Sequence, residues 1–479
     1  MKKLSKSMPA VPGLFFLGSV FEFISATPWD LMTTWHETYG PIYCFGLIGR
    51  TCVSVADPAT LKVMLQTKHS SFKKDLPFTY KPFLPILGKG IVTADGKEWM
   101  RQRTRVSKVL RIDILDEIPS ITLKAIQRLF KVIDSLPTDP EGGKVVEIAE
   151  LFRHLALHVI CEALLSVDAD ECDSKLAHMY LPIMDENNKQ VWNPLRAYAF
   201  ICPFWWEHRR NIRVLDCYVE KIINDRHDLR EKEKKSGGSE RRKDVLDRVM
   251  GAYEDNEGWG VKSAMQLRDE LKTFILAGHE TSAAMMTWAV HELVDGRGLW
   301  EGVRKESEEV WGGLVGGKRG GDMGVEDIPR RETELSKLEY SEACLKEALR
   351  KYSVVPTVTR TNVEDIDCAG TFFPKGTTFM IGIQGVHLNP EFWPNPTSYD
   401  PTRFLQGAKD IKPYTFLPFI EGPRMCLGQY LSLLESKCVL SLLFREYDVV
   451  RVGGMDGKRH RFNVPIVPED GVVVRCFKR

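Results

Sequence analysis

The 479-residue chain lacks several features that would assign it to common protein classes. It contains no run of about 20 apolar residues, the length of a membrane-spanning helix. Its 11 cysteines are odd in number and lack CxxC spacing, which argues against a disulfide framework or a zinc site and favours a reducing compartment. The net charge of +1 argues against nucleic acid as the main partner.

No Pro- or Ser-rich linker divides the chain, which predicts one large domain. The glycine-rich residues 312–321 lack the Gly-Lys-Ser/Thr order of a phosphate-binding loop, so we interpret them as a surface loop. The charged residues 234–243 are interpreted as a flexible helix connection. The middle of the chain is predicted to be helical, and candidate strands gather toward its ends, at residues 42–45, 52–55, 378–383 and 472–476.

One cysteine, Cys426, lies in a loop whose composition suits a metal ligand. Gly422 and Gly428 allow a tight turn and a close approach of the backbone to a flat group. Arg424 can reach an acidic substituent of that group, and Phe419 can cover the sulfur. A cysteine alone is more often a small buried hydrophobe. Cys426 therefore gains meaning only from the motifs upstream.

A long helix is predicted over residues 265–293, where apolar residues recur at helical spacing. Ser263 and Gln266 are expected to form a capping box at its start.

The middle of this helix combines small, acidic and hydroxyl residues. Ala277 and Gly278 leave room beside the helix for a diatomic ligand. The Thr281 hydroxyl, bonded back to a carbonyl, can bend the helix and hold a water. Glu280 beside it adds an acid, and an acid with an alcohol is the minimum for relaying protons to O2. We interpret His279 as a packing residue rather than a metal ligand.

Two further groups of polar residues precede the cysteine loop. Glu347 and Arg350 share a helical face, and Arg403 can complete a buried charge network with the same carboxylate. Trp99 and Arg103 are four residues apart, so their indole N–H and guanidinium can meet one carboxylate.

In this order, from residue 99 to residue 428, the motifs resemble those of the cytochrome P-450 superfamily. The loop fits Phe-x-x-Gly-x-Arg-x-Cys-x-Gly at every fixed position, although Glu421 stands where the family usually has a small residue. The resemblance implies a mainly α fold with a small β region, a triangular helical prism around a buried haem. It also implies that Cys426 is the axial ligand of the haem iron, whose thiolate favours O–O cleavage.

The resemblance assigns a role to each group. Thr281 and Glu280 would deliver protons, while a structural network would support the cysteine loop. Electrons would come from NADPH through a flavoprotein reductase or a ferredoxin to haem b. The structural network would be Glu347, Arg350 and Arg403; the propionates would be held by Trp99, Arg103, Arg360 and Arg424; and Phe419, Gly422, Gly428, Ala277 and Gly278 would surround the haem.

The implied activity is insertion of one atom of O2 into a C–H or C=C bond of an apolar substrate. Residues 266–282 are most similar to plastid carotenoid ring hydroxylases, with fatty-acid hydroxylases next, so a lipid or terpenoid substrate is expected. A haem-thiolate hydroperoxide isomerase or dehydratase is an alternative that the Glu280 and Thr281 pair disfavours. A haem-based gas sensor is an alternative from another class, for which no region is left to form an output domain.

Residues 1–13 are interpreted as a tail and proline-rich hinge, and residues 14–479 as a single monooxygenase domain. Many eukaryotic relatives carry an amino-terminal anchor, so either an anchor or transit peptide has been removed or the enzyme is peripheral. We expect membrane association, at the endoplasmic reticulum or in a plastid. The aromatic residues between 200 and 206 suit a membrane-dipping loop, with a buried helix connection as the alternative.

A cationic stripe lies on the helix expected to begin near Trp99. Arg103 should turn toward the haem, while Arg101, Arg105 and Lys108 fall on an outward face. This face is the predicted docking site of the acidic redox partner.

Overall fold

The structure is a computed structural model that describes residues 8–109, 114–192, 196, 199–236, 243–257, 260–312, 323–324, 327–405, 408–453, 458–459 and 464–479. Most residues of the predicted glycine-rich loop and of the charged helix connection lie outside these ranges. The division into residues 1–13 and 14–479 stays a prediction.

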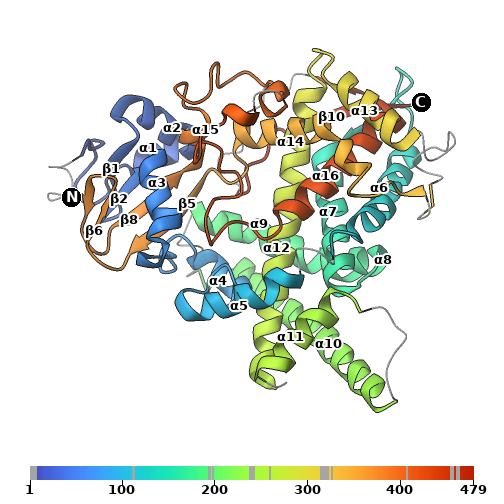
Figure 1. The fold of residues 1–479 in the computed structure, drawn as a ribbon, viewed down its shortest axis with the longest axis horizontal. Coiled ribbons are helices and arrows are strands. Elements are labelled where there is room, and N and C mark those ends of the chain that lie inside the picture. Colours follow the sequence, from blue (N-terminus) through green and yellow to red (C-terminus); the bar gives the residue numbers. More distant parts are fainter. Residues whose placement is uncertain are drawn as a thin grey trace.

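Helices fill the centre and one side of the molecule, and strands gather at the opposite side (Figure 1). The predicted mainly α fold with a small β region is confirmed. The α-helices are α1 (Val20–Ser25), α2 (Pro28–Tyr39), α3 (Pro58–Lys62), α4 (Leu84–Leu87), α5 (Gly96–Val109), α6 (Ile118–Ser135), α7 (Ile148–Leu165), α8 (Ala169–Glu171), α9 (His178–Trp192), α10 (Pro203–Lys235), α11 (Val245–Glu257), α12 (Val261–Leu293), α13 (Trp300–Gly312), α14 (Glu339–Tyr352), α15 (Ile383–His387) and α16 (Gln429–Glu446).

Shorter helical turns join these elements. Two are π-helices, η1 (Val63–Thr67) and η4 (Cys172–Ala177). The 3-10 turns are η2 (His69–Ser71), η3 (Lys81–Phe83), η8 (Leu335–Lys337), η9 (Pro401–Phe404) and η10 (Ala408–Asp410).

The main sheet has the order β1-β2-β8-β5-β3, in which β2 and β8 are parallel and the other neighbours are antiparallel. A second sheet has the order β4-β10-β9, and β6 pairs with β7. The predicted strands correspond to β1, β2, β8 and β10, with ends shifted by one or two residues. The strands are β1 (Ile42–Leu47), β2 (Arg50–Val55), β3 (Phe72–Lys73), β4 (Lys144–Glu147), β5 (Thr357–Asn362), β6 (Ile366–Cys368), β7 (Thr371–Phe373), β8 (Thr378–Gly382), β9 (Tyr447–Arg451) and β10 (Val473–Lys478).

The long helix α12 crosses the middle of the molecule and packs against α7 (Figure 1). At Gly278 a Cβ atom would lie 2.7 Å from Cδ1 of Ile160 on α7, closer than packed carbon atoms approach. Glycine therefore lets the two helices touch at this point. Part of the room that we expected beside Gly278 is filled by the Ile160 side chain.

The start of α12 differs from the prediction. The helix begins at Val261 rather than at residue 265, and Gly260 precedes it without a side-chain capping bond. The predicted capping box is wrong, because Ser263 lies buried within the first turn and the Gln266 amide donates to the carbonyl oxygen of Lys89 (2.8 Å). A tertiary contact has taken the place of the local one.

Candidate functional site

The cysteine loop, residues 419–428, is held by hydrogen bonds within its own backbone. The Cys426 N–H donates to the Phe419 carbonyl oxygen (2.9 Å), and the Met425 N–H donates to that of Gly422 (3.0 Å). Gly422 has a φ of 80°, and a Cβ there would lie 2.1 Å from the backbone oxygen of Leu65. Only glycine meets both conditions, because other residues are strained at this φ and a Cβ would clash.

The Cys426 side chain faces a cavity and is exposed to it. The surrounding protein still desolvates the thiol, and this burial raises its pKa. Backbone N–H groups of Gly428 and Gln429, at the start of α16, and the charge of Arg103 act in the opposite direction. The thiol is therefore protonated near neutral pH, and a cation placed against the sulfur would release its proton.

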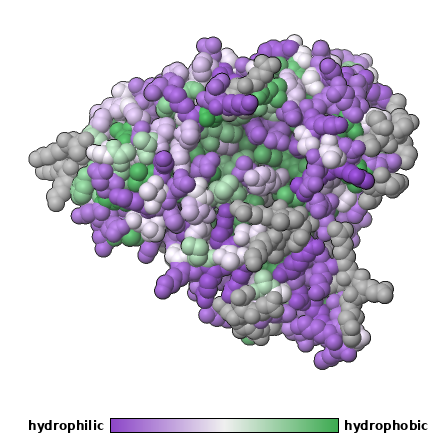
Figure 2. All heavy atoms as spheres, in the orientation of Figure 1, coloured by the Kyte–Doolittle hydropathy of each residue, from purple (hydrophilic) through white to green (hydrophobic). Residues whose placement is uncertain are grey.

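The cavity lies between α5, α7, α12 and the cysteine loop. Figure 2 shows the molecule in the orientation of Figure 1. On the face turned to the viewer, hydrophobic residues gather near the centre and hydrophilic residues surround them. The lining is mostly apolar, and it brings together residues predicted from separate motifs. The predicted residues that line it are Trp99, Arg103, Ala277, Gly278, Thr281, Phe419, Arg424, Cys426 and Gly428; Lys74, Ile91, Val92, Ile160, Leu164, Thr273 and Phe274 line it too.

Thr281 lies on the α12 wall of the cavity. Its hydroxyl donates to the Ala277 carbonyl oxygen (2.7 Å), as the helix motif predicts. The hydroxyl hydrogen is used in this bond, so the oxygen is left with lone pairs that can accept a hydrogen bond from a water in the cavity.

The side chain of Glu280 faces α7 instead of the cavity wall formed by Thr281. Its carboxylate accepts a hydrogen bond from Arg153 (2.8 Å) and lies 3.2 Å from Nε2 of His279. Burial alone would raise the pKa of Glu280, but His279 and Arg153 outweigh it and hold this pKa at about 2. The carboxyl is thus ionised at neutral pH. Its role in proton delivery stays a prediction.

Arg153 was not singled out from the sequence, because no local spacing relates it to Glu280. The contact between α7 and α12 brings the two residues together across 127 positions of the chain.

Arg424 is held beside Trp99 on the cavity wall. Its guanidinium carbon lies 4.1 Å from the Trp99 ring centroid, and it donates to the Ala94 carbonyl oxygen (2.8 Å) and to Asp95 (2.6 Å). Burial lowers the pKa of Arg424 to about 10; Asp95 opposes this shift, whereas Arg360 adds to it. Among the described residues, Arg360 is not part of the cavity wall but is buried near Arg424.

Lys74 joins this cationic cluster and contacts Tyr80, and the sequence motifs did not identify Lys74. Lys74 donates to the Tyr80 hydroxyl (3.0 Å). Burial, followed by the charge of Arg360, lowers the pKa of Lys74 to about 8. Burial would raise the pKa of Tyr80, but Lys74 and Arg360 lower it. Arg360 thus lies close enough to lower the pKa of both Lys74 and Arg424. Of these three cationic side chains, that of Arg424 is paired with the Asp95 carboxylate. An arrangement with excess positive charge suits anionic groups.

The residues present fit a haem. The Cys426 thiol and the cationic cluster border one mostly apolar cavity. The backbone of the cysteine loop packs closely against that of Leu65 at Gly422.

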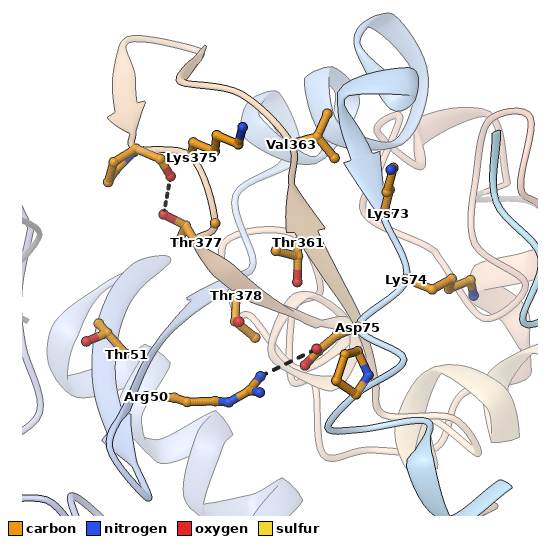
Figure 3. A pocket seen from close by; sticks show the side chains of 13 residues that line it. Arg50, Thr51, Lys73, Lys74, Asp75, Thr361, Val363, Lys375, Thr377 and Thr378 are labelled. Atoms are coloured by element: carbon orange, nitrogen blue, oxygen red, sulfur yellow. Dashed lines mark hydrogen bonds and ion pairs between the residues drawn. The ribbon is translucent and has the colours of Figure 1, made fainter. Parts of the chain in front are cut away.

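A second pocket, of about 640 Å³, lies beside β2, β5 and β8 (Figure 3). It shares Lys74 with the cavity, and Arg50 and Asp75 form an ion pair within it (3.5 Å). Among the described residues that line it, none belongs to the cysteine loop or to α12.

The predicted charge network is assembled on α14. Glu347 and Arg350 are fully buried and joined by two hydrogen bonds of 2.7 Å, and Nε of Arg403 lies 3.4 Å from the same carboxylate. Breaking such a buried pair typically costs about 3–5 kcal/mol, because it leaves one charge uncompensated.

His387 connects this network to the cysteine loop. Arg350 donates to the His387 carbonyl oxygen (2.9 Å), and Nε2 of His387 accepts from the backbone N–H of Leu417 (2.7 Å). The Leu417 carbonyl in turn accepts from Ile420, inside the loop. Nε2 is an acceptor here, so the ring is neutral and its Nδ1 proton faces Ser353.

The cationic stripe on α5 is less open than predicted. Arg101 is exposed and forms an ion pair with Glu98 (2.6 Å). Arg105 is less exposed than predicted: its side chain is half-buried, α11 packs against α5, and the Arg105 guanidinium carbon lies 4.7 Å from the Tyr253 ring centroid. The side chain of Lys108 is outside what the structure describes.

Comparisons with known proteins agree with this site. The family model described as Cytochrome P450 matches residues 8–466. The chain is 28% identical to Cytochrome P450 4c21 of Blattella germanica, over 98% of this chain and 93% of that protein. It is 27% identical to Cytochrome P450 4V2 of Homo sapiens (79% and 71%) and 24% identical to Cytochrome P450 4d2 of Drosophila melanogaster (97% and 92%).

Proposed function

The chain belongs to the cytochrome P450 family, and we propose that this monooxygenase inserts one atom of O2 into a C–H or C=C bond of a lipid, with fatty acids and terpenoids as the candidate classes. The observation that carries the proposal is that Cys426 and Thr281 line one mostly apolar cavity. An apolar lining favours substrates that lose little hydration on entry.

Family membership implies a haem and a redox partner. We propose haem b, which Cys426 would hold through its sulfur and Trp99, Arg103, Arg360 and Arg424 would hold through its propionates. Lys74 joins this set because it borders the cavity within the same cationic cluster. When bound, the haem supplies the iron that activates O2, and thiolate ligation favours O–O cleavage.

The protein's own groups would handle water and protons. The Thr281 hydroxyl donates its hydrogen to the Ala277 carbonyl oxygen. Its oxygen would therefore accept a hydrogen bond from a water and hold that water in the cavity. Glu280 is held ionised by His279 and Arg153, and with Thr281 it would deliver protons to O2. A hydroperoxide isomerase or dehydratase needs no proton relay, so the presence of both Glu280 and Thr281 favours the monooxygenase.

We propose that electrons come from NADPH through a flavoprotein reductase or a ferredoxin that docks near α5, where Arg101 is exposed.

We also propose peripheral membrane contact. Among the described residues, no helix has the length and hydropathy of a membrane span. Large apolar side chains are nevertheless exposed in two segments, which suits insertion into the lipid boundary. They are Leu14, Phe15, Phe16, Phe21 and Ile24 near α1, and Phe200, Ile201 and Trp206 before and within α10.

Carbon monoxide binding to the reduced protein tests the central assignment. The wild type should show the red-shifted Soret band of thiolate ligation, and Cys426→Ala should lose it, because the ligand is removed. Cys217→Ala, which changes an exposed cysteine on α10, should keep the band. An unchanged band in Cys426→Ala would refute the ligand assignment. A panel of fatty acids, other lipids and terpenoids, screened for substrate-induced spectral shifts, would then identify the substrate class.

A further inference from the structure

A second group of ligand-type side chains lies outside the cavity, between α7 and the π-helix η4. His154 and His158 are one turn apart on α7, and Asp173 reaches them from η4. Oδ1 of Asp173 lies 2.6 Å from Nε2 of His158 and 3.4 Å from Nδ1 of His154. The three ligand atoms all lie within 4.8 Å of one another, and among the described residues no other such group comes together.

Two imidazoles and one carboxylate form a donor set that suits a divalent transition metal. Histidines four residues apart project from the same face of a helix, so one ion can bind both. Zinc takes nitrogen and oxygen ligands at about 2.0–2.2 Å, which places neighbouring ligand atoms a little over 3 Å apart in a tetrahedral site. The separations from Asp173 Oδ1 bracket that value.

The two oxygens of Asp173 have different partners. Arg128 on α6 donates to Oδ2 (2.9 Å), whereas Oδ1 is the atom that faces both histidines. A partner of this kind orients a ligating carboxylate, although its charge also opposes the cation. The His154 side chain is 37% exposed and that of His158 only 8%, so the group is rigid on its inner side and reachable from solvent.

We propose that His154, His158 and Asp173 form a zinc site, with water completing the coordination. The site lies apart from the cavity and does not depend on the proposed function. The bound zinc would link α7 to η4. Since α7 also carries Arg153, which holds Glu280, and Ile160, which packs on Gly278, the ion would brace the helix that supports α12.

Zinc uptake by the intact haem-containing protein tests the proposal. The wild type and the variants His154→Ala and Asp173→Asn are freed of metal with a chelator and dialysed against a series of zinc concentrations, and bound zinc is counted by mass spectrometry. The wild type should bind one zinc more than either variant. Loss of one ligand should weaken binding more than about 100-fold, because loss of an outer partner alone typically costs about 10–100-fold.

A matched control and a second measurement separate this site from other zinc-binding groups. His227→Ala removes a histidine that also lies beside a carboxylate, that of Asp228 (3.8 Å), and should leave the zinc count unchanged. Zinc should raise the melting temperature of the wild type and of His227→Ala but not of the two site variants. Asp173→Asn preserves the shape of the side chain, so it provides the test if His154→Ala does not fold. Equal zinc counts in the wild type and both site variants would show that the cluster is only hydrogen-bonded and would overturn the proposal.

Discussion

At the scale of single residues, the adjacent side chains of Glu280 and Thr281 on α12 point in different directions. Thr281 lines the cavity, whereas Glu280 is bound to Arg153 and His279 and is ionised, with a pKa of about 2. Successive residues of a helix are rotated by about 100°, so an acid and an alcohol adjacent in sequence need not face the same space. Any water that Thr281 holds is therefore positioned by the hydroxyl itself.

Replacing Thr281 tests this role. Thr281→Ala should retain haem and substrate binding but lower the rate of product formation by about 100-fold to 10,000-fold, the usual cost of losing an acid–base contact. Reducing equivalents should appear instead as hydrogen peroxide. The ratio of product to NADPH consumed is the measurement.

Thr287 supplies the control for this substitution. It lies on the same helix and makes the same bond, to the Ala283 carbonyl oxygen (2.8 Å), but it does not line the cavity. Thr287→Ala should therefore leave the coupling ratio unchanged. Normal coupling in Thr281→Ala would indicate that its hydroxyl serves the helix alone.

At the scale of elements, α5 has two different faces. Trp99 and Arg103 face the cavity, Arg105 is half-buried against Tyr253 of α11, and Arg101 is exposed. The surface available to a redox partner is therefore narrower than a stripe of three cations. Screening acts over about 10 Å at 0.1 M salt, so attraction between this surface and an acidic partner should depend on ionic strength.

Charge reversal on α5 tests the docking surface. Arg101→Glu combined with Lys108→Glu should slow reduction by the partner at low salt and weaken the salt dependence of this step, because steering by opposite charge is lost. Substrate binding should not change. Stopped-flow reduction rates at several salt concentrations are the measurement.

A comparable ion pair elsewhere provides the control. Arg479 is paired with Glu308 (3.1 Å) near the carboxyl terminus, which lies far from α5 in Figure 1. Arg479→Glu should leave the reduction rate close to that of the wild type. If the α5 variant also matches the wild type at low salt, the partner docks on another face.

At the scale of the whole molecule, stability should depend on pH through buried neutral histidines. Burial, and next the charge of Arg350, lower the pKa of His387 to about 3, against about 6.5 in an unfolded chain. Between these values the unfolded chain binds one proton more than the native protein. Lowering the pH below about 6.5 therefore favours unfolding. His36, whose pKa burial lowers to about 4, acts in the same direction.

His387→Gln isolates one such contribution. Glutamine can still accept from Leu417 but does not titrate, so the variant should lose about 2 kcal/mol less stability than the wild type between pH 7 and pH 5. Denaturant unfolding of the haem-containing protein at both pH values is the measurement. An identical loss in both proteins would mean that His387 is protonated in the folded state.

Sequence alone determined the features that depend on local pattern. The cysteine loop needs glycine and arginine at fixed spacing, so the sequence is sufficient to identify its motif, the α12 motif and the Glu347 and Arg350 pair. Strands β1, β2, β8 and β10 were also predicted, whereas β5 was missed because Thr357–Asn362 carries little apolar alternation and is fixed by its neighbours.

Only the tertiary structure decided which distant groups meet. Packed helices and paired strands bring together three pairs that no local spacing in the sequence predicts. These pairs are Arg153 with Glu280, His387 with Leu417, and Lys74 with Arg360. The same packing half-buried Arg105 against Tyr253 and replaced the predicted capping box with the hydrogen bond from the Gln266 amide to the Lys89 carbonyl oxygen. The reason is physical: propensity and periodicity act over a few residues, whereas burial, charge pairing and desolvation depend on neighbours in space.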